Sequence, residues 1–440
     1  MKKITPHTNR ISQSRQKRKQ QLNKNRFKEG LGMIIPKLPF LNRDNSLALR
    51  SQSNPNKEVQ SPDKVLLFIT GILMIFGWIM IYSGSFYVES QTKHTIFYDY
   101  NPFNNFILQG FWIIAGLIVS YIVYRIPHRF YIKFSLPVLV ILIILLIVIL
   151  LLPKSVNGAK LWLNVGNFTL QPAEFIKPAL ICYFAGLLAK KWNTKTTDQI
   201  KQYLFNRFIP FFLVFAVTII FVFLGKDLGA TALIAAISIT MFFFCDNQAI
   251  HNFATSSLLV ITIIVSAILA ITERYRFQRL NTFINFIITG NIPDPLNTGF
   301  QLKQILIAVG TGGLFGSGFG QSKQKYFYLQ RTAVTDTIFA VIAEEFGLFG
   351  SVILVLAYVT IFFRGLKIAQ YSKTKSGSLM ALGITVWISL QTIIHLGVNV
   401  GLVPLTGITL PFVSYGGSSL ISTMVGMAML LNLSKDVKVK

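Results

Sequence analysis

Ten long apolar stretches recur along this 440-residue chain and restrict its fold more than any other feature. They begin near Val65, Asn105, Phe130, Glu174, Phe205, Leu228, Phe253, Asp336, Gly377 and Val413. An α-helix of about 20 apolar residues crosses the roughly 30 Å hydrocarbon core of a bilayer and satisfies its own backbone hydrogen bonds. With 52% hydrophobic and 13% charged residues, the chain is too apolar for a water-soluble globule. The sequence therefore predicts an all-α polytopic membrane protein with about ten transmembrane helices, which occupy residues 65–434.

The first 64 residues have a different composition. They carry 15 Lys and Arg against 4 Asp and Glu and contain no hydrophobic run, which predicts a disordered basic cytoplasmic tail. The tail lacks the early apolar segment of a cleaved secretory signal, so we expect the first span to be retained as an anchor. Attraction to anionic lipid explains such a tail better than sequence-specific binding, and no nucleic-acid partner is expected. Residues 435–440 form a second, short cytoplasmic tail.

The basic residues also predict the orientation, because loops rich in Lys and Arg stay in the cytoplasm. The tail places the N-terminus inside, and ten spans return the C-terminus to the same side. The even-numbered connections agree, since cations such as Arg125, Lys190 and Arg364 then fall inside. The longest outer connection in this arrangement is the one between the seventh and eighth spans.

That outer connection, residues 273–335, is long enough to expect a function, because long loops in compact proteins usually carry one. It contains seven cations against two acids, Glu273 and Asp294, which suggests an anionic ligand on the outer face. The cations are Arg274, Arg276, Arg279, Lys303, Lys323, Lys325 and Arg331. Contact with lipid headgroups is the alternative explanation. The apolar runs FINFIITG and FQLKQILIAVG predict that parts of the loop pack back onto the membrane domain or lie amphipathically at its surface.

Five carboxylates lie within the predicted spans or at their outer ends: Glu174, Asp227, Asp336, Glu344 and Glu345. Ionisable groups at this depth are costly unless paired or solvated, so they mark candidate functional sites. Lys177 lies one helical turn beyond Glu174 and can pair with it, either for function or as a polar staple between helices. Asp227 and Asp336 each stand where a helix begins, so helix capping is the structural alternative for both. The cationic loop beside Asp336 favours function there.

Glycines gather in two places. Gly313, Gly316, Gly318 and Gly320 could wrap a diphosphate with backbone N–H groups, or could allow close packing. Their spacing and context are not those of a dinucleotide fingerprint. For the SYGGSS run at Ser414–Ser419, close helix packing is the favoured explanation.

Metal and disulfide chemistry have little support in the sequence. The five histidines show no ligand spacing, and the two cysteines, Cys182 and Cys245, both fall within apolar spans. No metal site and no firm cofactor is predicted, and the need for a divalent cation is left open.

Five segments carry the most specific information. They are NGAKLWLNVGNFTLQPAEFIKPAL (157–180), KDLGATAL (226–233), GTGGLFGSGFGQSKQKYFYL (310–329), TDTIFAVIAEEFGLFG (335–350) and HLGVNVGLVPLTGITLPFVSYGGSSL (395–420). In this order they resemble the SEDS family of FtsW and RodA, and the resemblance covers the whole membrane region, about 65–434. The basic tail and the segment TGITLPFVSYGGSS resemble the cell-division branch of the family, FtsW, more closely than the elongation branch, RodA.

The resemblance implies a ten-helix peptidoglycan glycosyltransferase that polymerises lipid II on the outer face of the cytoplasmic membrane. It implies a class B penicillin-binding protein transpeptidase as partner, with other division proteins and membrane lipids as further contacts. The expected location is the inner membrane of a bacterial-type cell, at the division septum, with both termini cytoplasmic. The family's essential loop aspartate maps onto Asp336.

The chain departs from the family's pattern at four places. Leu161 stands where a basic residue usually precedes the tryptophan, which leaves Lys160 to supply charge, and Lys226 replaces the proline of QPDLG. The run LQRTAVTD is one residue longer than its counterpart, lacks the proline, and has Arg331 where an acid is common. His395 stands where Asn is frequent. These departures affect the expected geometry of the substrate groove more than the identity of the reaction.

Chain extension joins a sugar hydroxyl to an anomeric carbon that carries a lipid diphosphate, so the site needs a base and cations. We expect Asp336 to orient and deprotonate the hydroxyl, and direct displacement by one base predicts inversion. We expect Lys160, Lys323, Lys325 and Arg331 to neutralise the leaving pyrophosphate. The remaining expected substrate-binding residues are Glu174, Lys177, Asp227, Gln301, Ser414, Gly416, Gly417 and Ser418.

Three other functions stay open from the sequence: a lipid II flippase or transporter, an elongation-type polymerase like RodA, and a catalytically silent division scaffold. A flippase needs a continuous hydrophilic path to the cytoplasm. Here the ionisable residues concentrate in the outer half or outside, which favours the enzyme.

Overall fold

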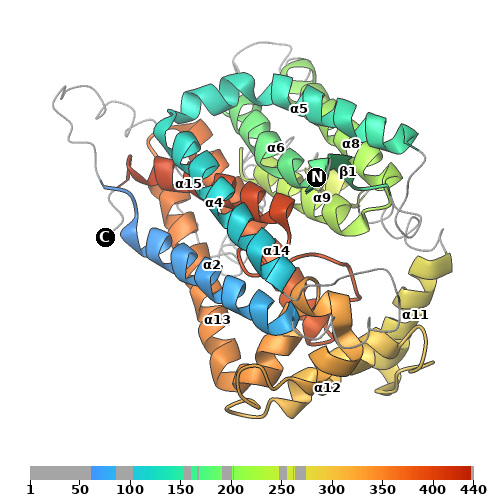
Figure 1. Cartoon of the computed structure of the whole chain (residues 1–440). Helices are drawn as coiled ribbons and strands as arrows, with labels where there is room; N and C mark the ends of the chain where they lie inside the picture. The colour runs from blue at the N-terminus through green and yellow to red at the C-terminus, as the bar shows by residue number, and fades with distance from the viewer. Residues whose placement is uncertain are drawn as a thin grey trace, which may run out of the picture. The chain divides into compact units, whose positions relative to one another are not determined.

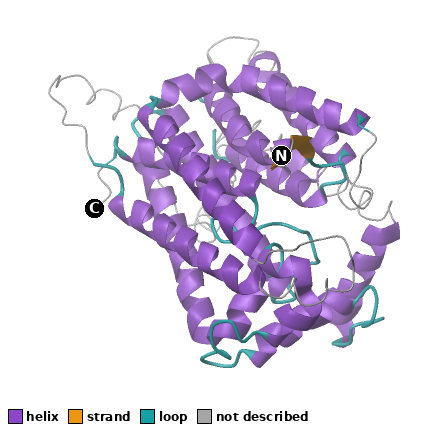
Figure 2. Ribbon diagram, viewed as in Figure 1, coloured by secondary structure: helices purple, strands orange, loops and turns teal. Residues whose placement is uncertain are grey.

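The structure is a computed structural model, and it describes residues 61–85, 103–152, 160–165, 168–190, 201, 203–246, 255–260, 262 and 274–437. Most of these residues are helical (Figure 2). Most of the predicted basic tail, much of the span that begins near Phe253, and most of the outer connection 87–104 lie outside the described residues.

The described helices lie at the positions of the predicted spans, except for the seventh, which lies largely outside the described residues. In chain order they are α2 (Lys64–Ser85), α4 (Phe103–Arg125), α5 (His128–Leu151), α6 (Pro172–Leu188), α8 (Ile209–Leu224), α9 (Leu228–Phe243), α13 (Ile338–Tyr371), α14 (Lys375–Asn399) and α15 (Gly417–Ser434). The π-helix η3 (Leu204–Phe208) leads directly into α8. Among the described residues, seven helices are long and apolar enough to cross a membrane, and α9 is a shorter apolar helix. The chain is therefore a multi-pass helical membrane protein, while the count of ten spans stays a prediction.

Several helices begin where a side chain accepts hydrogen bonds from the free N–H groups of the first turn, or where a proline has no N–H to satisfy. Asp63 Oδ1 accepts from the backbone N–H groups of Val65 and Leu66 at 3.0 and 3.1 Å, which caps α2. Thr374 Oγ1 caps α14 by accepting from Gly377 N at 3.0 Å. Pro172 stands at the first position of α6, where its missing N–H is not needed.

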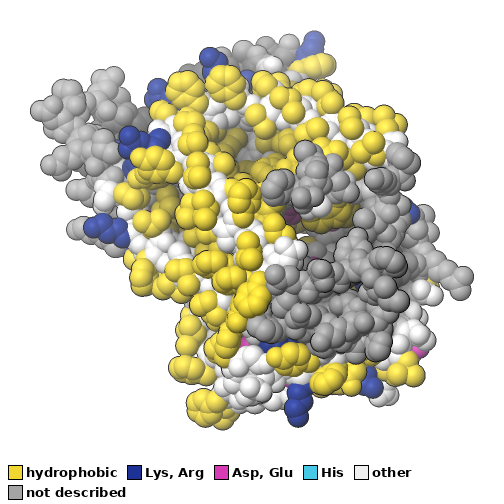
Figure 3. Space-filling model, viewed as in Figure 1, with side chains coloured by type: hydrophobic (Ala, Val, Ile, Leu, Met, Phe, Trp, Pro, Cys, Tyr) yellow, Lys and Arg dark blue, Asp and Glu magenta, His cyan; other side chains and the backbone are white. Residues whose placement is uncertain are grey.

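The helix α14 lies at the centre of the packing. It contacts α13, α6, α9 and α15, and its Trp387 is fully buried and donates to Gln391 Oε1 at 2.8 Å. The pairs α4 with α15 and α5 with α6 complete the bundle, and α5, α6, α8 and α9 gather in the upper part of Figure 1. Hydrophobic side chains cover the visible face of α2, α4 and α5 (Figure 3), as expected of helix surfaces in contact with lipid.

The predicted outer loop contains four short elements of its own: α11 (Arg274–Thr289), α12 (Phe300–Thr311), η4 (Lys325–Leu329) and η5 (Gln330–Val334). The two apolar runs in the loop become the C-terminal half of α11 and most of α12. The α12 helix buries Leu302, Ile305 and Ala308 and contacts α13 and α14, so the prediction that parts of the loop pack back is confirmed.

The first glycine cluster meets a break in α13. Gly347 interrupts that helix with φ +66°, and the peptide groups freed there pair with the glycine loop. Ser317 N and Gly318 N donate to the carbonyls of Glu344 and Glu345 at 2.9 and 3.0 Å, and Leu348 N donates to Gly313 O at 2.9 Å. A Cβ on Gly316 would lie 2.2 Å from Glu345 O. Close packing therefore explains Gly316, and the N–H groups of Gly316 and Gly318 are used inside the protein rather than offered to a diphosphate.

A short antiparallel hairpin precedes α6. Strands β1 (Leu163–Val165) and β2 (Phe168–Leu170) pair with Leu163 opposite Leu170. The chain then enters α6 through Gln171, whose N–H donates to Ser418 Oγ at 3.0 Å. This bond joins the start of α6 to the start of α15 and brings two distant motifs together.

Candidate active site

A cavity of about 820 Å³ lies where the starts of α6, α9, α13 and α15 meet α11 and the 404–409 segment. Six ionisable residues line it: Glu174, Lys177, Lys226, Asp227, Arg279 and Asp336. Polar and small residues complete the wall, among them Gln171, Thr335, Thr406, Thr409, Tyr415, Gly416, Ser418 and Ser419. Three of the five carboxylates singled out in the sequence therefore meet in one cavity, although they are up to 162 residues apart, from Glu174 to Asp336.

The backbone around Asp336 is fixed by the C-terminal part of the chain. Asn399 Nδ2 donates to Asp336 O at 3.0 Å, and Ser414 Oγ donates to Thr335 O at 2.8 Å. Tyr415 N donates to Val334 O at 2.8 Å. Because neighbouring carbonyls are held from α14 and from the segment before α15, the position of the carboxylate depends on both.

Asp336 does not act as the cap of α13. The N-cap residue is Thr337, which makes no side-chain capping bond. Burial raises the pKa of the Asp336 carboxyl, while the Arg279 guanidinium and a hydrogen bond from Thr335 act in the opposite direction. A carboxylate with a raised pKa is a better base than an exposed aspartate, so the functional interpretation is favoured over the capping one.

Asp227 does cap its helix, as the sequence allowed. Its Oδ1 accepts from Ala230 N at 2.8 Å, and its Oδ2 accepts from Gln171 Nε2 at 2.9 Å. Burial and the nearby Glu174 raise the pKa of Asp227, and the bond from Ala230 opposes them. Asp227 therefore links the start of α9 to the start of α6 and presents its carboxylate to the cavity.

The predicted pairing of Glu174 with Lys177 is confirmed. Lys177 Nζ donates to Glu174 Oε2 at 2.8 Å and to Gln391 Oε1 at 3.2 Å, and it lies 5.2 Å from the ring centre of Trp387. Ser422 Oγ donates to Glu174 Oε2 at 3.3 Å. The pair thus joins α6, α14 and α15 and contributes a polar patch without net charge to the cavity wall.

The second glycine cluster divides between the cavity and the packing. Gly416 and Ser418 line the cavity. A Cβ on Gly417 would lie 2.4 Å from the Trp112 indole, so Gly417 allows α15 to approach α4 closely. Ser414 lies behind the wall, where its hydroxyl holds Thr335 and accepts from Leu410 N at 2.8 Å.

Where the structure describes their side chains, the cations expected at the leaving group do not line the cavity. Lys160 Nζ donates to Leu150 O at 2.7 Å, while the next two residues, Leu161 and Trp162, line the cavity. Lys323 is exposed, and its backbone N–H donates to Glu344 Oε1 at 2.9 Å. Arg331 belongs to η5, and its side chain lies outside the described set. Gln301 is half-buried within α12.

Lys325 requires a correction. Its side chain is fully buried and forms an ion pair with Glu345, and its Nζ also donates to Ser83 Oγ at 2.6 Å. Ser83 Oγ in turn donates to Glu345 Oε1 at 2.9 Å. The ammonium is used between η4, α2 and α13, so we remove Lys325 from the set of residues that contact a ligand.

Arg279 lines the cavity, and the sequence analysis did not single it out from the other loop cations. It lies in α11, lines the cavity, donates from Nη1 to Leu405 O at 3.4 Å, and acts electrostatically on Asp336. The signal was the amphipathic pattern of residues 274–289, because a helix there directs a subset of its cations to one face. Counting the loop cations together did not distinguish Arg279 from the others.

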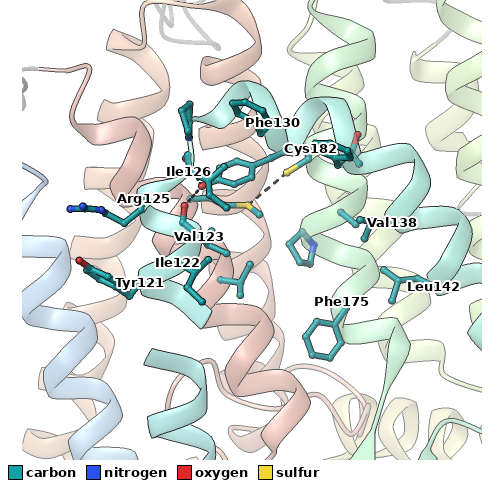
Figure 4. Close-up of a pocket in the computed structure, with 18 of the residues that line it drawn as sticks. Tyr121, Ile122, Val123, Arg125, Ile126, Phe130, Val138, Leu142, Phe175 and Cys182 are labelled. Atoms are coloured by element: carbon teal, nitrogen blue, oxygen red, sulfur yellow. Dashed lines mark hydrogen bonds between the residues drawn. The ribbon is translucent and has the colours of Figure 1, made fainter. Parts of the chain in front are cut away.

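A second cavity of about 1030 Å³ lies among α4, α5, α6 and α15 and is almost entirely apolar. Figure 4 shows its lining, with Phe130, Val138 and Leu142 from α5 facing Phe175 and Cys182 from α6. Phe175 and Pro178 of this cavity alternate along α6 with Glu174 and Lys177 of the polar cavity. One end of α6 therefore separates a polar compartment from an apolar one.

Comparison with known proteins agrees with this arrangement. A family model described as cell cycle protein, FTSW_RODA_SPOVE, matches residues 63–439. A probable peptidoglycan glycosyltransferase FtsW from Legionella pneumophila is 34% identical over 402 residues, which cover 89% of this chain and 96% of that protein. Stage V sporulation protein E from Bacillus subtilis is 34% identical over 381 residues, covering 85% of this chain and 97% of that protein.

Two solved structures share the fold. One, from a study of a peptidoglycan synthase complex that coordinates polymerization and crosslinking, has a TM-score of 0.63 at 22% identity and covers 86% of this chain and 99% of its own. The rod shape determining protein RodA of Thermus thermophilus has a TM-score of 0.60 at 22% identity, with 86% and 98% coverage.

Proposed function

Because this chain belongs to the FtsW/RodA/SpoVE family of membrane proteins, we propose that it polymerises lipid II into glycan strands at the outer face of the cytoplasmic membrane. It is a peptidoglycan glycosyltransferase, as the names of its FtsW relatives indicate. The observation that carries the catalytic assignment is the placement of Asp336, half-buried in a polar cavity with Arg279 on the same wall.

Asp336 acts as the general base. Its carboxylate accepts the proton of the acceptor sugar hydroxyl while that oxygen attacks the anomeric carbon of the donor, and the bond from that carbon to the diphosphate breaks. Proton transfer to a placed base contributes about 10²–10⁴ in rate. Attack from the face opposite the leaving group inverts the configuration of the anomeric carbon.

Arg279 replaces the loop lysines as the cation for the leaving group. It lines the same cavity as Asp336, and a guanidinium binds phosphate oxygens with two parallel hydrogen bonds. The negative charge that develops on the diphosphate is then met by a fixed positive group that lines the cavity. The same positive charge lowers the pKa of Asp336 and so opposes part of the effect of burial.

The two cavities fit the two ends of an amphiphilic substrate. The polar cavity matches the sugar and diphosphate of lipid II, and the apolar cavity on the other side of α6 matches a polyprenyl chain. A lipid-linked donor needs such neighbouring compartments, because its chain stays in the hydrocarbon layer while its head group reacts in the polar site.

The finer features of the assignment follow from the sequence. We propose about ten spans, cytoplasmic termini and an outward-facing active site, on the distribution of Lys and Arg. We also propose a role in septal synthesis with a class B penicillin-binding protein. The similarity to a solved peptidoglycan synthase complex and to FtsW proteins supports this proposal.

A flippase is disfavoured by the layer behind the polar cavity. On α6, Lys177 is followed by Cys182, whose thiol contacts the sulfur atoms of Met380 and Met429 at 3.6 and 3.7 Å. All three of these sulfur-containing residues are buried. A polar head group crossing this layer would lose its hydrogen bonds, which is costly in a water-free interior.

The proposed function is tested with purified protein and lipid II. Asp336→Asn keeps the size of the side chain and removes the base, so we expect polymer formation to fall at least 100-fold, about the lower limit for a general base. Asp436→Asn is the matched control, because Asp436 forms an exposed ion pair with Lys373 away from the cavity and its replacement should leave the rate unchanged. Undiminished polymer formation by Asp336→Asn would exclude Asp336 as the base.

A further inference from the structure

The turn between α8 and α9 contains an unexpected residue in a strained conformation. Only Gly225, Lys226 and Asp227 join the two helices, and Lys226 has φ +70°. This is the left-handed region at the end of a helix, where glycine is strongly preferred because it has no Cβ. A lysine at this position costs stability that a glycine would not.

The backbone of the turn is held on both sides of Lys226. Gly225 O accepts from Lys160 N at 3.2 Å, and the Asp227 carboxylate is fixed by Ala230 N and Gln171 Nε2. Lys226 N itself donates to Phe223 O at 2.8 Å. The lysine therefore starts from a fixed point at the cavity wall, and its exposed side chain lines the cavity.

A strained residue whose side chain reaches a functional cavity suggests that the side chain, not the backbone, is what the position requires. We infer that Lys226 is a second cation of the active-site cavity and binds the diphosphate of the lipid-linked donor together with Arg279. This inference rests on the proposed function, because that function supplies the diphosphate. A lysine ammonium suits phosphate as a compact charge, whereas Arg279 offers a fork of donors.

A purely structural role makes a different prediction. A cation near the C-terminus of α8 also interacts favourably with the helix dipole. If that were its only role, removing the charge would lower the melting temperature and leave the Michaelis constant for lipid II unchanged. Two substitutions separate these roles. Lys226→Gly removes both the charge and the backbone strain, whereas Lys226→Gln removes the charge and keeps the strain.

The experiment uses the purified full-length chain and the variants Lys226→Gly and Lys226→Gln. We expect both to raise the KM for lipid II about five- to tenfold, the range for a partly solvated charge-assisted hydrogen bond. We expect Lys226→Gly to melt at the same or a higher temperature than the unmodified protein. Lys373→Gln, which removes an exposed lysine from an ion pair with Asp436 and belongs to no proposed site, should change neither value.

Binding is measured separately from catalysis, with undecaprenyl diphosphate, undecaprenyl monophosphate and inorganic pyrophosphate as probes. We expect both variants to weaken binding of the lipid diphosphate more than that of the monophosphate, and a parallel loss with pyrophosphate would locate the effect in the diphosphate itself. An unchanged KM together with unchanged diphosphate binding would overturn the inference. If the unmodified protein bound the lipid diphosphate but made no polymer, the proposed function would be wrong. The binding measurements on the two variants would still decide whether Lys226 binds the diphosphate.

Discussion

The buried ion pair between Lys325 and Glu345 gives the sharpest prediction about the outer loop. Both side chains are fully buried, and Ser83 Oγ contacts both partners. Lys325→Met keeps an unbranched side chain of similar length and removes the ammonium, which leaves the buried Glu345 without its partner. Losing one member of a buried pair typically costs about 3–5 kcal/mol. We therefore expect the melting temperature of the purified protein to fall by roughly 5 °C or more.

A second variant separates the charge imbalance from the loss of packing. Lys325→Met combined with Glu345→Gln removes both charges, and a buried pair replaced as a unit is often close to neutral in stability. We expect the double variant to recover most of the loss, so the measured coupling between the two positions should be about 2 kcal/mol or more. Lys323→Met is the matched control, because that lysine is exposed and its replacement should change the stability by less than about 0.5 kcal/mol.

The result also decides between two roles for the loop lysine. Thermal unfolding and lipid II polymerisation are measured on the same preparations. If Lys325→Met were as stable as the unmodified protein and instead had a raised KM, Lys325 would contact the substrate and the buried pairing would be wrong. A loss of stability that the double variant recovers would show that Lys325 anchors η4 to α2 and α13.

Three further predictions follow from the cavity and the glycine loop. Removing the Arg279 charge raises the pKa of Asp336 further, and the base is active only when ionised. Arg279→Gln should therefore shift the acidic limb of the pH profile of kcat/KM to higher pH, and an unshifted limb would contradict the coupling. Because burial raises the pKa of Asp336 above its unfolded value, this carboxyl favours folding at low pH and loses that contribution as the pH rises through its folded pKa. Asp336→Asn should then match or exceed the melting temperature of the unmodified protein at pH 7, and a lower value would indicate a structural role. Gly316→Ala should cost about 1–3 kcal/mol more than Gly320→Ala, since both glycines have φ +80° but only the first Cβ would meet the α13 backbone; equal melting temperatures would contradict the packing.

The span pattern was the most predictable part of the fold. Helices need about 20 apolar residues to cross a bilayer, so α2, α4, α5, α13 and α14 begin within about two residues of the predicted positions. The start of α15 was less accurate, because the apolar run from Val413 continues through a turn before the helix begins at Gly417. Hydrophobicity alone does not distinguish a buried turn from the first turn of a helix.

The sequence identifies the carboxylates as functional candidates. It predicts the partner of a carboxylate only where that partner lies nearby on the same helix. Glu174 and Lys177 lie one turn apart on a single helix, so their pairing follows from the sequence. Lys325 and Glu345 belong to different elements, η4 and α13, and they meet because the two elements pack together with α2. The spacing of the two residues in the sequence therefore does not predict their contact. The cationic appearance of the outer loop therefore overstated the charge available to a ligand.

Most of the acidic groups that line the cavity are stabilised by partners within the protein, and Asp336 is the least well stabilised of them. Glu174 and Lys177 neutralise one another, and Asp227 is held by a backbone N–H and an amide, so these groups tolerate the low-dielectric surroundings without a ligand. For Asp336, the field of Arg279 and a hydrogen bond from Thr335 oppose the effect of burial without cancelling it, so its pKa stays raised. A base that is incompletely stabilised before the substrate arrives has a raised pKa and accepts a proton more readily. Burial of the Asp336 carboxylate is unfavourable, because the group would be more stable in water. Hydrogen bonds from Asn399, Ser414 and Tyr415 to the backbone of residues 334–336 offset this unfavourable free energy and hold the residue at the cavity.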